Sequence, residues 1–288
     1  MENKIILNGE LFSSSSQYLK TNRAFRYGDG LFESIKVING TAISIDYHYQ
    51  RIIAGLEALK IQYDTSFSLQ NIKSLIIKLI TQNKIDKGGK IRLTVYRNGS
   101  GTYLPDTNDL CYLIEAEEHP LNYYELNNNG ISIDVFKDLY KPVNYISKFK
   151  TLNGLLYVLA SEFAKNSMLD DSLIVNGTGK IIEATSSNIF IVSNGVLYTP
   201  PLEDGCVGGI MRMMVINTAL SNNITVYENS LTPQNLLNAD EVFLTNTISG
   251  IKWVRGFQQK RYYNETAKKI VDLINEQILN FEKGLKEN

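Results

Sequence analysis

A polar stretch from Glu117 to Asn129 divides the sequence into two halves, and each half has its own pattern of strand-like and helix-like segments. A chain of 288 residues is longer than one ordinary domain. Domain boundaries commonly fall in exposed polar segments of this kind. We therefore predict two domains, residues 1–120 and 121–288, with an α+β architecture.

The first half combines β-rich runs with two helical stretches. Apolar residues at helical spacing predict helices over 46–60 and 68–83. Hairpin dipeptides at Asn8-Gly9 and Asn39-Gly40 follow two of the β-rich runs. The predicted strands of this half are 5–7, 31–38, 90–96 and 110–116.

The second half begins with a predicted strand and ends in a long amphipathic helix. Helices are predicted over about 152–167, 209–221 and from 266 onward. Short strands are predicted at 131–136, between 172 and 198, near 225 and at 241–245.

Composition excludes several classes of protein. A formal net charge of −1 provides no field that would gather nucleic acid or an anionic membrane. Two cysteines form neither a disulfide framework nor a zinc cluster, and two histidines exclude a histidine-rich metal site. We find no signal peptide and no run long enough to cross a bilayer, so we expect a cytoplasmic protein.

Common nucleotide-binding and hydrolase motifs do not fit. The GDG at Gly28–Gly30 precedes a predicted strand, and Glu33 stands where a dinucleotide loop needs its third glycine. The sequence has no GxxxxGK[ST] loop and no nucleophile elbow.

One region carries a specific signature. EATSSNIF at 183–190 is followed by LYTPPLEDGCVGGIMR at 197–212. Throughout its length this region resembles the signature of class IV aminotransferases. KTLNGLL at 150–156 resembles the catalytic-lysine segment of that family, and YGDGLFES at 27–34 resembles its N-terminal turn. The resemblance covers nearly the whole chain.

The resemblance implies a fold-type-IV enzyme that uses pyridoxal 5′-phosphate (PLP). Such an enzyme has a smaller N-terminal α/β domain and a larger C-terminal domain with a β-barrel-like core, and its cofactor lies at the domain interface. It acts as a homodimer on small-molecule amino acids and 2-oxo acids, with no nucleic acid, membrane or metal as partner.

Two residues would carry the chemistry. PLP enzymes need a lysine amine that condenses with the cofactor aldehyde and later moves the Cα proton. The K-x-L-N pattern selects Lys150 over its neighbour Lys148. Glu183 would face the pyridine nitrogen and keep the ring protonated.

The remaining cofactor contacts would come from distant segments. The helix start at Gly209, Ile210 and Met211 offers N–H groups to the phosphate. Arg51 resembles the phosphate arginine of the family and Thr247 would add a hydroxyl. Asn188 and Val207 complete the predicted cofactor contacts.

The predicted substrate side consists of Phe32, Arg92, Arg97, Tyr103 and Ile248. Arg92 and Arg97 are an odd number of strand positions apart and should point to opposite faces, so only one can bind a carboxylate. The loop after Arg97 would reach the active site of a partner subunit.

The subfamily patterns fit incompletely. Thr102 and Tyr103 stand where D-amino-acid transaminases carry an Arg-x-His trap, which argues against D-amino acids. GGIMR is instead lyase-like. We predict a transaminase for a small, possibly branched-chain, amino acid and a 2-oxo acid. The alternative is 4-amino-4-deoxychorismate lyase, and a non-catalytic relative is disfavoured because both Lys150 and Glu183 are present.

Overall fold

The computed structural model describes residues 4–13 and 22–286, and it divides into two compact units. The first unit contains the described residues up to Tyr123 together with Phe149–Asn153, and the second contains Tyr124–Lys148 and the described residues from Gly154 onward. The sequence-based division at residue 120 assigned residues 149–153 to the second domain. In the structure this segment pairs with the first unit, because Phe32 N–H donates to the Lys150 carbonyl and Leu152 N–H to the Gly30 carbonyl.

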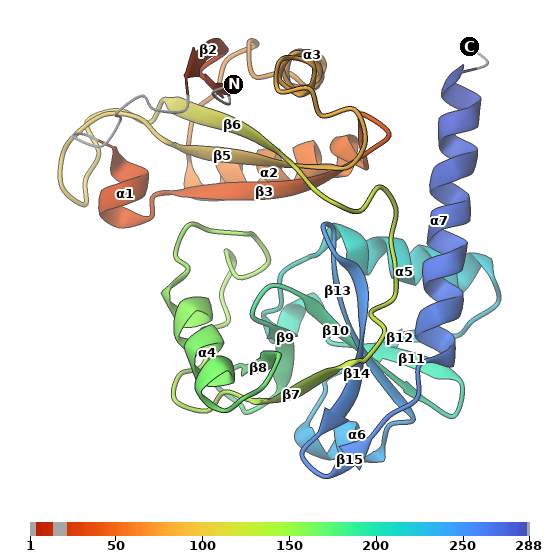
Figure 1. Ribbon diagram of the computed structural model, residues 1–288. Coiled ribbons are helices and arrows are strands. Elements are labelled where there is room, and N and C mark those ends of the chain that lie inside the picture. Colours follow the sequence, from red (N-terminus) through yellow and green to blue (C-terminus); the bar gives the residue numbers. More distant parts are fainter. Residues whose placement is uncertain (1–3, 14–21, 287–288) are drawn as a thin grey trace. The chain divides into compact units, whose positions relative to one another are not determined.

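A six-stranded antiparallel sheet forms the framework of the first unit (Figure 1). Its long strands alternate buried and partly exposed residues, as expected of a sheet with one covered face. The sheet order is β2-β1-β6-β5-β3-β4. The strands are β1 (Lys4–Leu7), β2 (Glu10–Ser13), β3 (Gly30–Ile38), β4 (Thr41–Ala42), β5 (Gly89–Arg97) and β6 (Leu110–Glu118).

Two amphipathic helices pack on this sheet. Helix α2 (Ile45–Leu59) lies against β3, and α3 (Leu69–Gln82) lies against β1 and β6. Their apolar faces are buried because Ile52 and Leu56 on α2, and Ile72 and Ile76 on α3, recur at helical spacing. Ser68 caps α3 by accepting a hydrogen bond from the backbone of Asn71, and a short helix, α1 (Arg23–Tyr27), precedes β3.

The second unit contains a nine-stranded sheet in the order β12-β11-β10-β13-β14-β7-β8-β9, with β15 paired to β14. The sheet curls, so that β9 contacts β10. Its strands are β7 (Ile131–Val135), β8 (Asp171–Val175), β9 (Ile181–Ala184), β10 (Asn188–Ser193), β11 (Val196–Thr199), β12 (Val226–Glu228), β13 (Glu241–Asn246), β14 (Gly250–Phe257) and β15 (Lys260–Arg261).

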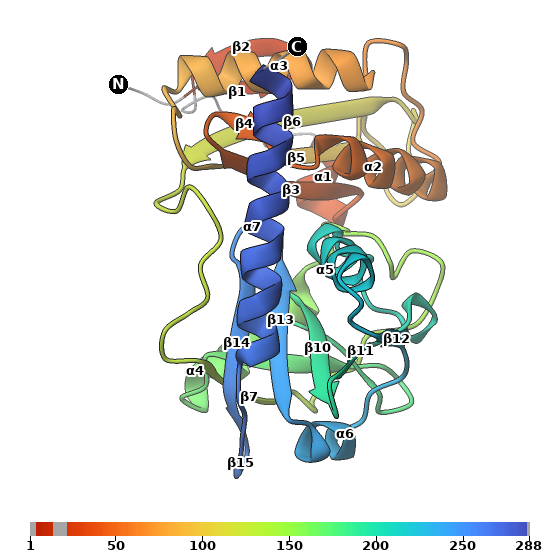
Figure 2. The same cartoon turned by 90° about the vertical axis from the view of Figure 1, so that its right-hand side faces the viewer.

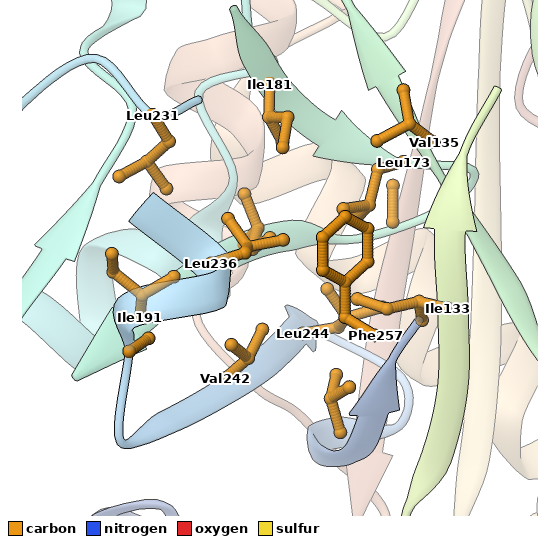
Figure 3. Packing of buried hydrophobic residues seen from close by; sticks show 14 of the residues in the cluster. Ile133, Val135, Leu173, Ile181, Ile191, Leu231, Leu236, Val242, Leu244 and Phe257 are labelled. Carbon is orange, nitrogen blue, oxygen red and sulfur yellow. The ribbon is translucent and has the colours of Figure 1, made fainter. Parts of the chain in front are cut away.

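The curled sheet encloses an apolar core. Figure 3 shows Phe257, Leu244 and Ile133 from three neighbouring strands pointing into the same interior, with Leu173 beside them. On another part of the sheet the rings of Phe190 and Phe243 stack with centroids 5.2 Å apart. This interior is the β-barrel-like core that the family resemblance implies.

Helices cover the outside of the curled sheet. Helix α4 (Leu155–Asn166) packs on β8, and α5 (Ile210–Ser221) packs on β13 and on the C-terminal helix α7 (Glu265–Lys286). Figure 2 shows α7 running alongside β13 and β14. A one-turn helix, η1 (Leu202–Asp204), and α6 (Pro233–Asn238) complete the unit. No helix in the described part of the chain is both long and apolar enough to span a bilayer.

Candidate active site

Glu183 is the centre of a buried polar cluster in the second unit. It lies on β9, whose four residues are all buried, and its side chain is 3% exposed. Its Oε1 atom lies 2.7 Å from Lys141 Nζ and accepts a 2.8 Å hydrogen bond from the Tyr157 hydroxyl. Its Oε2 atom accepts a 2.7 Å hydrogen bond from the Val207 backbone N–H. A buried carboxylate is stable only with such partners.

The contacts of Glu183 leave room for one more donor. A carboxylate oxygen has two lone pairs, and both acceptor positions of Oε1 are filled by Lys141 and Tyr157. Oε2 receives Val207 N–H and, within the part of the chain that the structure describes, no second donor. The geometry therefore suits one further N–H group, as on a protonated ring nitrogen.

The N-terminus of helix α5 lies beside Val207. Gly209 is the N-cap residue, and no side chain caps this helix start. Asn188 Nδ2 donates a 2.7 Å hydrogen bond to the Val207 carbonyl, and a Cβ atom on Gly209 would lie 1.9 Å from Asn188 Oδ1. A side chain at this position would force the Asn188 amide to move. The N–H groups at an uncapped helix start, with the helix dipole, are suited to an anion such as phosphate.

The turn after β13 contains Thr247 and Ile248. Asn246 Oδ1 accepts hydrogen bonds from the backbone N–H groups of Ile248, at 3.0 Å, and Ser249, at 2.8 Å. The Thr247 carbonyl accepts a 2.8 Å bond from the Tyr124 hydroxyl. Ile248 was expected to contact substrate, but its N–H is already bonded within the turn, so only its side chain is available for such a contact.

In the first unit, Arg51 belongs to a buried triad with Glu33 and His48. Arg51 Nε donates a 2.6 Å hydrogen bond to Glu33 Oε1, and a second Arg51 nitrogen pairs with Oε2. His48 Nδ1 lies 2.7 Å from the same Oε2 atom. His48 and Arg51 lie one helical turn apart on α2, so both side chains face Glu33 on β3.

Burial and neighbouring charges shift the pKa values of Glu33 and His48 in this triad. Burial alone would raise the pKa of Glu33, but Arg51 and His48 overcome that effect and hold it at about 2. Burial lowers the pKa of His48 despite the Glu33 carboxylate, and the Arg51 and Lys150 cations lower it further.

Lys150 itself lies beside Phe32. Its Nζ atom is 4.6 Å from the centre of the Phe32 ring, and Arg92 Cζ is 4.0 Å from the same centre. Lys150 is half-buried, whereas Lys148, the other candidate, is exposed. Arg92 is half-buried, and burial lowers its pKa. The structure therefore places two cations around one apolar wall.

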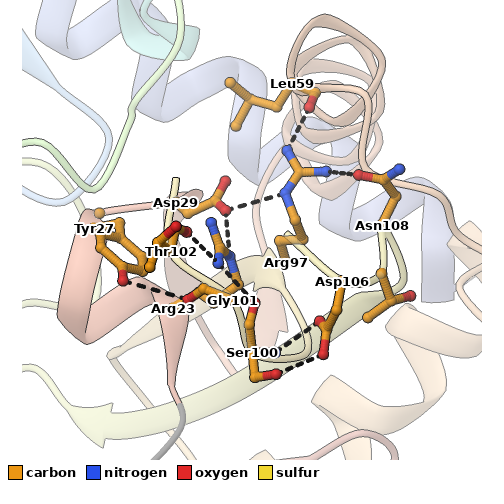
Figure 4. Close-up of polar contacts among 12 residues, drawn as sticks. Arg23, Tyr27, Asp29, Leu59, Arg97, Ser100, Gly101, Thr102, Asp106 and Asn108 are labelled. Atoms are coloured by element: carbon orange, nitrogen blue, oxygen red, sulfur yellow. Dashed lines mark hydrogen bonds and ion pairs between the residues drawn. The ribbon is translucent and has the colours of Figure 1, made fainter. Parts of the chain in front are cut away.

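Arg97, the other candidate for a substrate carboxylate, is occupied by structural contacts. It donates to Asp29, to Asn108 and to the carbonyl group of Leu59 (Figure 4). It also donates to the carbonyl group of Lys60. Arg92 instead stacks on Phe32, and Glu115, its cross-strand partner on β6, acts on it through its charge. These contacts favour Arg92 for the carboxylate and give Arg97 a bracing role.

The loop from Asn98 to Asp109 is braced by α1 and exposes its tip. Arg23 donates to the carbonyl groups of Ser100 and Thr102, at 2.9 Å each, and to Asp29. Ser100 donates to Asp106 across the loop (Figure 4). Tyr103 and Leu104 are 90% and 83% exposed. A braced loop with two exposed apolar side chains is organised for contact with another surface.

The predicted site residues thus form two groups, one in each unit. In the first unit, Arg51 pairs with Glu33 beside His48, and Lys150 and Arg92 both lie against Phe32. In the second unit, Glu183, Asn188, Val207 and Gly209 are joined through backbone and side-chain bonds, and Ile210 and Met211, both buried, follow them into α5. Lys141, Tyr157 and Glu33 were not predicted as site residues from the sequence. Only Glu33 had a signal, the i,i+3 pair His48–Arg51 facing a strand.

PLP fits the donor set of these residues. In the second unit, the carboxylate of Glu183 keeps one acceptor position and the start of α5 is uncapped. In the first unit, Arg51 is a permanent cation. No group of three or more histidine, cysteine, aspartate or glutamate side chains in the described residues could hold a metal ion.

A half-barrel sheet with a buried glutamate in one unit, and a smaller α/β unit with a half-buried lysine, are the features of the fold-type-IV class of PLP enzymes. Residues 30–256 match the family model for class IV aminotransferases, and the chain belongs to that family.

Individual relatives point to several members of this family. A D-alanine aminotransferase of Staphylococcus aureus is 30% identical over 249 residues, 85% of each chain. The structure of a branched-chain aminotransferase from Thermoproteus uzoniensis with norvaline has a TM-score of 0.85 at 23% identity, covering 97% of this chain and 96% of that one. A Legionella pneumophila structure, provisionally described as a 4-amino-4-deoxychorismate lyase, has a TM-score of 0.81 at 25% identity, covering 91% and 96%.

Proposed function

We propose that the protein is a PLP-dependent transaminase that moves an amino group between a small amino acid and a 2-oxo acid in the cytoplasm. The observation that carries this proposal is the Glu183 carboxylate, which is buried, ionically paired and one donor short of complete hydrogen bonding.

Bound PLP would supply an aldehyde carbon that accepts the amino group and a ring that takes up the electrons released at the substrate Cα. The Lys150 amine would hold the cofactor. Once displaced by the substrate amine, it would take the proton from Cα and deliver it to the former aldehyde carbon of the cofactor, so that hydrolysis could release the oxo acid. Glu183 would keep the proton on the ring nitrogen. Arg51, Thr247 and the N–H groups of Ile210 and Met211 would bind the phosphate.

The substrate would lie against Phe32. Arg92, which stacks on that ring and is not held by the carbonyl groups that fix Arg97, would pair with a carboxylate of the substrate. Phe32 would exclude water from the side chain, which favours small apolar amino acids. Because relatives include both D-alanine and branched-chain aminotransferases, a donor screen must include both stereochemical series.

A homodimer would complete the substrate side. Tyr103 and Leu104 project from the braced loop, and the second unit also exposes a group of large apolar residues: Tyr140, Val143, Tyr145, Leu155, Val158 and Leu159. Apolar surface of this extent is typical of an interface. Closed two-fold dimers are the most common assembly, and we propose that a second copy covers these residues.

The test is a screen of the PLP-loaded protein with L-valine, L-leucine, D-alanine and L-glutamate as donors and 2-oxoglutarate or pyruvate as acceptor. We expect multiple-turnover transfer of the amino group from at least one donor to the oxo acid. Lys150→Ala should abolish this transfer. No transfer from any donor by protein that holds PLP on Lys150 would contradict the proposal.

The lyase is the second candidate, supported by the GGIMR segment and by the Legionella structure. In that reaction aminodeoxychorismate would lose its side chain as pyruvate and become 4-aminobenzoate, with the same lysine moving the proton. Including aminodeoxychorismate in the screen separates the two, because only the lyase releases pyruvate without an added oxo acid.

A further inference from the structure

Lys141 connects three elements of the second unit. Its backbone N–H donates to the Val175 carbonyl at the end of β8, and its Nζ atom donates to the Ser147 carbonyl at 2.9 Å. The same Nζ lies 2.7 Å from Glu183 Oε1. The Lys141 residue is 9% exposed, so this is a cation fixed by packing and not a mobile surface charge.

The other ionisable groups beside Glu183 are neutral. Burial and the Glu183 charge both raise the pKa of Tyr157, so its phenol stays protonated and donates to Oε1. Burial raises the pKa of the Cys206 thiol to about 12, so Cys206 carries no charge at neutral pH. Lys141 is therefore the one cation paired with Glu183 among the described residues.

The position of this cation has an electrostatic consequence. A donor on Oε2 lies on the far side of the carboxylate from Lys141, which is bound to Oε1. The lysine charge therefore stabilises the carboxylate more strongly than it repels a cation on Oε2, because Coulomb energy falls with distance. A proton shared between Glu183 and a ring nitrogen is consequently driven toward the nitrogen.

We propose that Lys141 is a positioning residue that keeps Glu183 ionised and thereby holds the proton on the ring nitrogen of bound PLP. Tyr157 assists by filling the second acceptor position of Oε1. The proposal rests on the proposed PLP function. Without Lys141, Glu183 would be a buried carboxylate without a counter-charge, which takes up a proton and leaves the ring nitrogen neutral.

The experiment uses two spectroscopic readouts on the full chain. The first is the ¹⁵N chemical shift of the ring nitrogen in protein loaded with ¹⁵N-labelled PLP. The second is the ¹³C shift of the Glu183 carboxyl in cofactor-free protein, assigned by its loss in Glu183→Gln. Lys141→Met removes the charge with little change in volume, and Lys141→Arg retains it. Lys180→Met is the matched control, since Lys180 pairs with Asp204 at 3.0 Å in the same unit without touching Glu183.

In the wild type and in Lys180→Met we expect a protonated ring nitrogen and an ionised Glu183. In Lys141→Met the ¹⁵N signal should move to the position of a neutral ring and the ¹³C signal to that of a protonated acid. Lys141→Arg should restore both. The proposal is overturned if the ¹⁵N shift of the ring nitrogen changes in Glu183→Gln but not in Lys141→Met. That outcome leaves the proposed PLP function intact.

Failure of the proposed function has a different outcome. A wild type that binds no PLP on Lys150 refutes that function, and the ¹³C readout then still decides whether Lys141 controls the charge of Glu183. If Lys141→Met does not fold, Tyr157→Phe is measured instead. It removes one hydrogen bond without leaving an unpaired charge, and a smaller ¹⁵N change in the same direction is expected. No change in Tyr157→Phe counts against the proposal.

Discussion

His48 Nδ1 lies 2.7 Å from Glu33 Oε2, and both side chains are almost completely buried. Because an ionised carboxylate only accepts hydrogen bonds, the proton of this contact is on Nδ1. The other ring nitrogen, Nε2, is buried without a hydrogen-bond partner among the described residues. The triad with Arg51 is thus a charged network inside the first unit, and its stability should depend on pH.

The first prediction concerns that dependence. The pKa of Glu33 is lowered from 4.5 to about 2, so its contribution to stability is complete above pH 4.5 and is lost as the pH falls through about 2. A shift of this size corresponds to about 3 kcal/mol. Urea unfolding of the wild type and of Glu33→Gln should show a difference that shrinks over this window. Glu117→Gln, which removes an exposed pair with Lys90, is the control and should change little.

The second prediction concerns the cofactor lysine. Borohydride reduction of the PLP-loaded protein should fix a pyridoxyl group on Lys150, as mapped by peptide mass spectrometry. Lys150→Ala should abolish turnover and the label. Lys148→Ala should retain both, because Lys148 is exposed while Lys150 faces Phe32. A label on Lys148 would show that the assignment is wrong.

The third prediction concerns Glu183→Gln. An amide cannot balance the charge of a protonated ring nitrogen, so the ring becomes a poorer acceptor of electrons. We expect kcat to fall about a hundredfold, or about 3 kcal/mol. Steady-state kinetics with saturating PLP measures this effect. Activity within a fewfold of the wild type would mean that another group protonates the ring.

The fourth prediction concerns Gly209→Ala. Its φ of −65° suits any residue, so the cost of the new Cβ is the 1.9 Å approach to Asn188 Oδ1 alone. We expect a loss of about 1–3 kcal/mol in unfolding free energy and weaker PLP binding. Gly154→Ala, at the start of α4 with no atom within 4 Å of the new Cβ, should be nearly neutral. Adding Asn188→Ala to Gly209→Ala should cost less than the sum of the single changes.

The fifth prediction concerns the exposed loop. If Tyr103 contacts substrate in a partner subunit, Tyr103→Ala should raise substrate Michaelis constants and leave PLP affinity unchanged. Tyr263→Ala is the control, since Tyr263 is 74% exposed and lies in the second unit. Mixing an inactive Lys150→Ala protein with an inactive loop variant should restore activity in hybrid dimers. A fully active monomer by light scattering would refute the shared site.

Local pattern was enough to find the regular elements. The apolar spacing of α2 and α3 and the β-rich runs of β3, β5 and β6 placed these elements within one or two residues of their observed bounds. Strand β14 was missed because charged residues, Lys252 and Arg255, interrupt its apolar positions, and its pairing with β13 and β7 depends on the tertiary fold.

The site was predictable only where a motif fixed it. Lys150 and Glu183 came from the family resemblance, whereas the link between Lys141 and Glu183 spans 42 positions and leaves no local trace. For Arg97, the sequence suggested a substrate-binding role that its contacts in the fold do not favour. A strand arginine beside a loop suggested a ligand for substrate, but its four acceptors come from residues 29, 59, 60 and 108, which only folding brings together.

Strand β7 runs parallel to both of its neighbours, β8 and β14. During synthesis on the ribosome, β8 becomes available soon after β7, but β14 begins only at Gly250. One edge of β7 therefore stays open while most of the second unit is being made, and an open edge can pair with another nascent chain. Overproduction should for this reason yield more native protein at slower translation, at lower temperature or with chaperones that shield exposed strands.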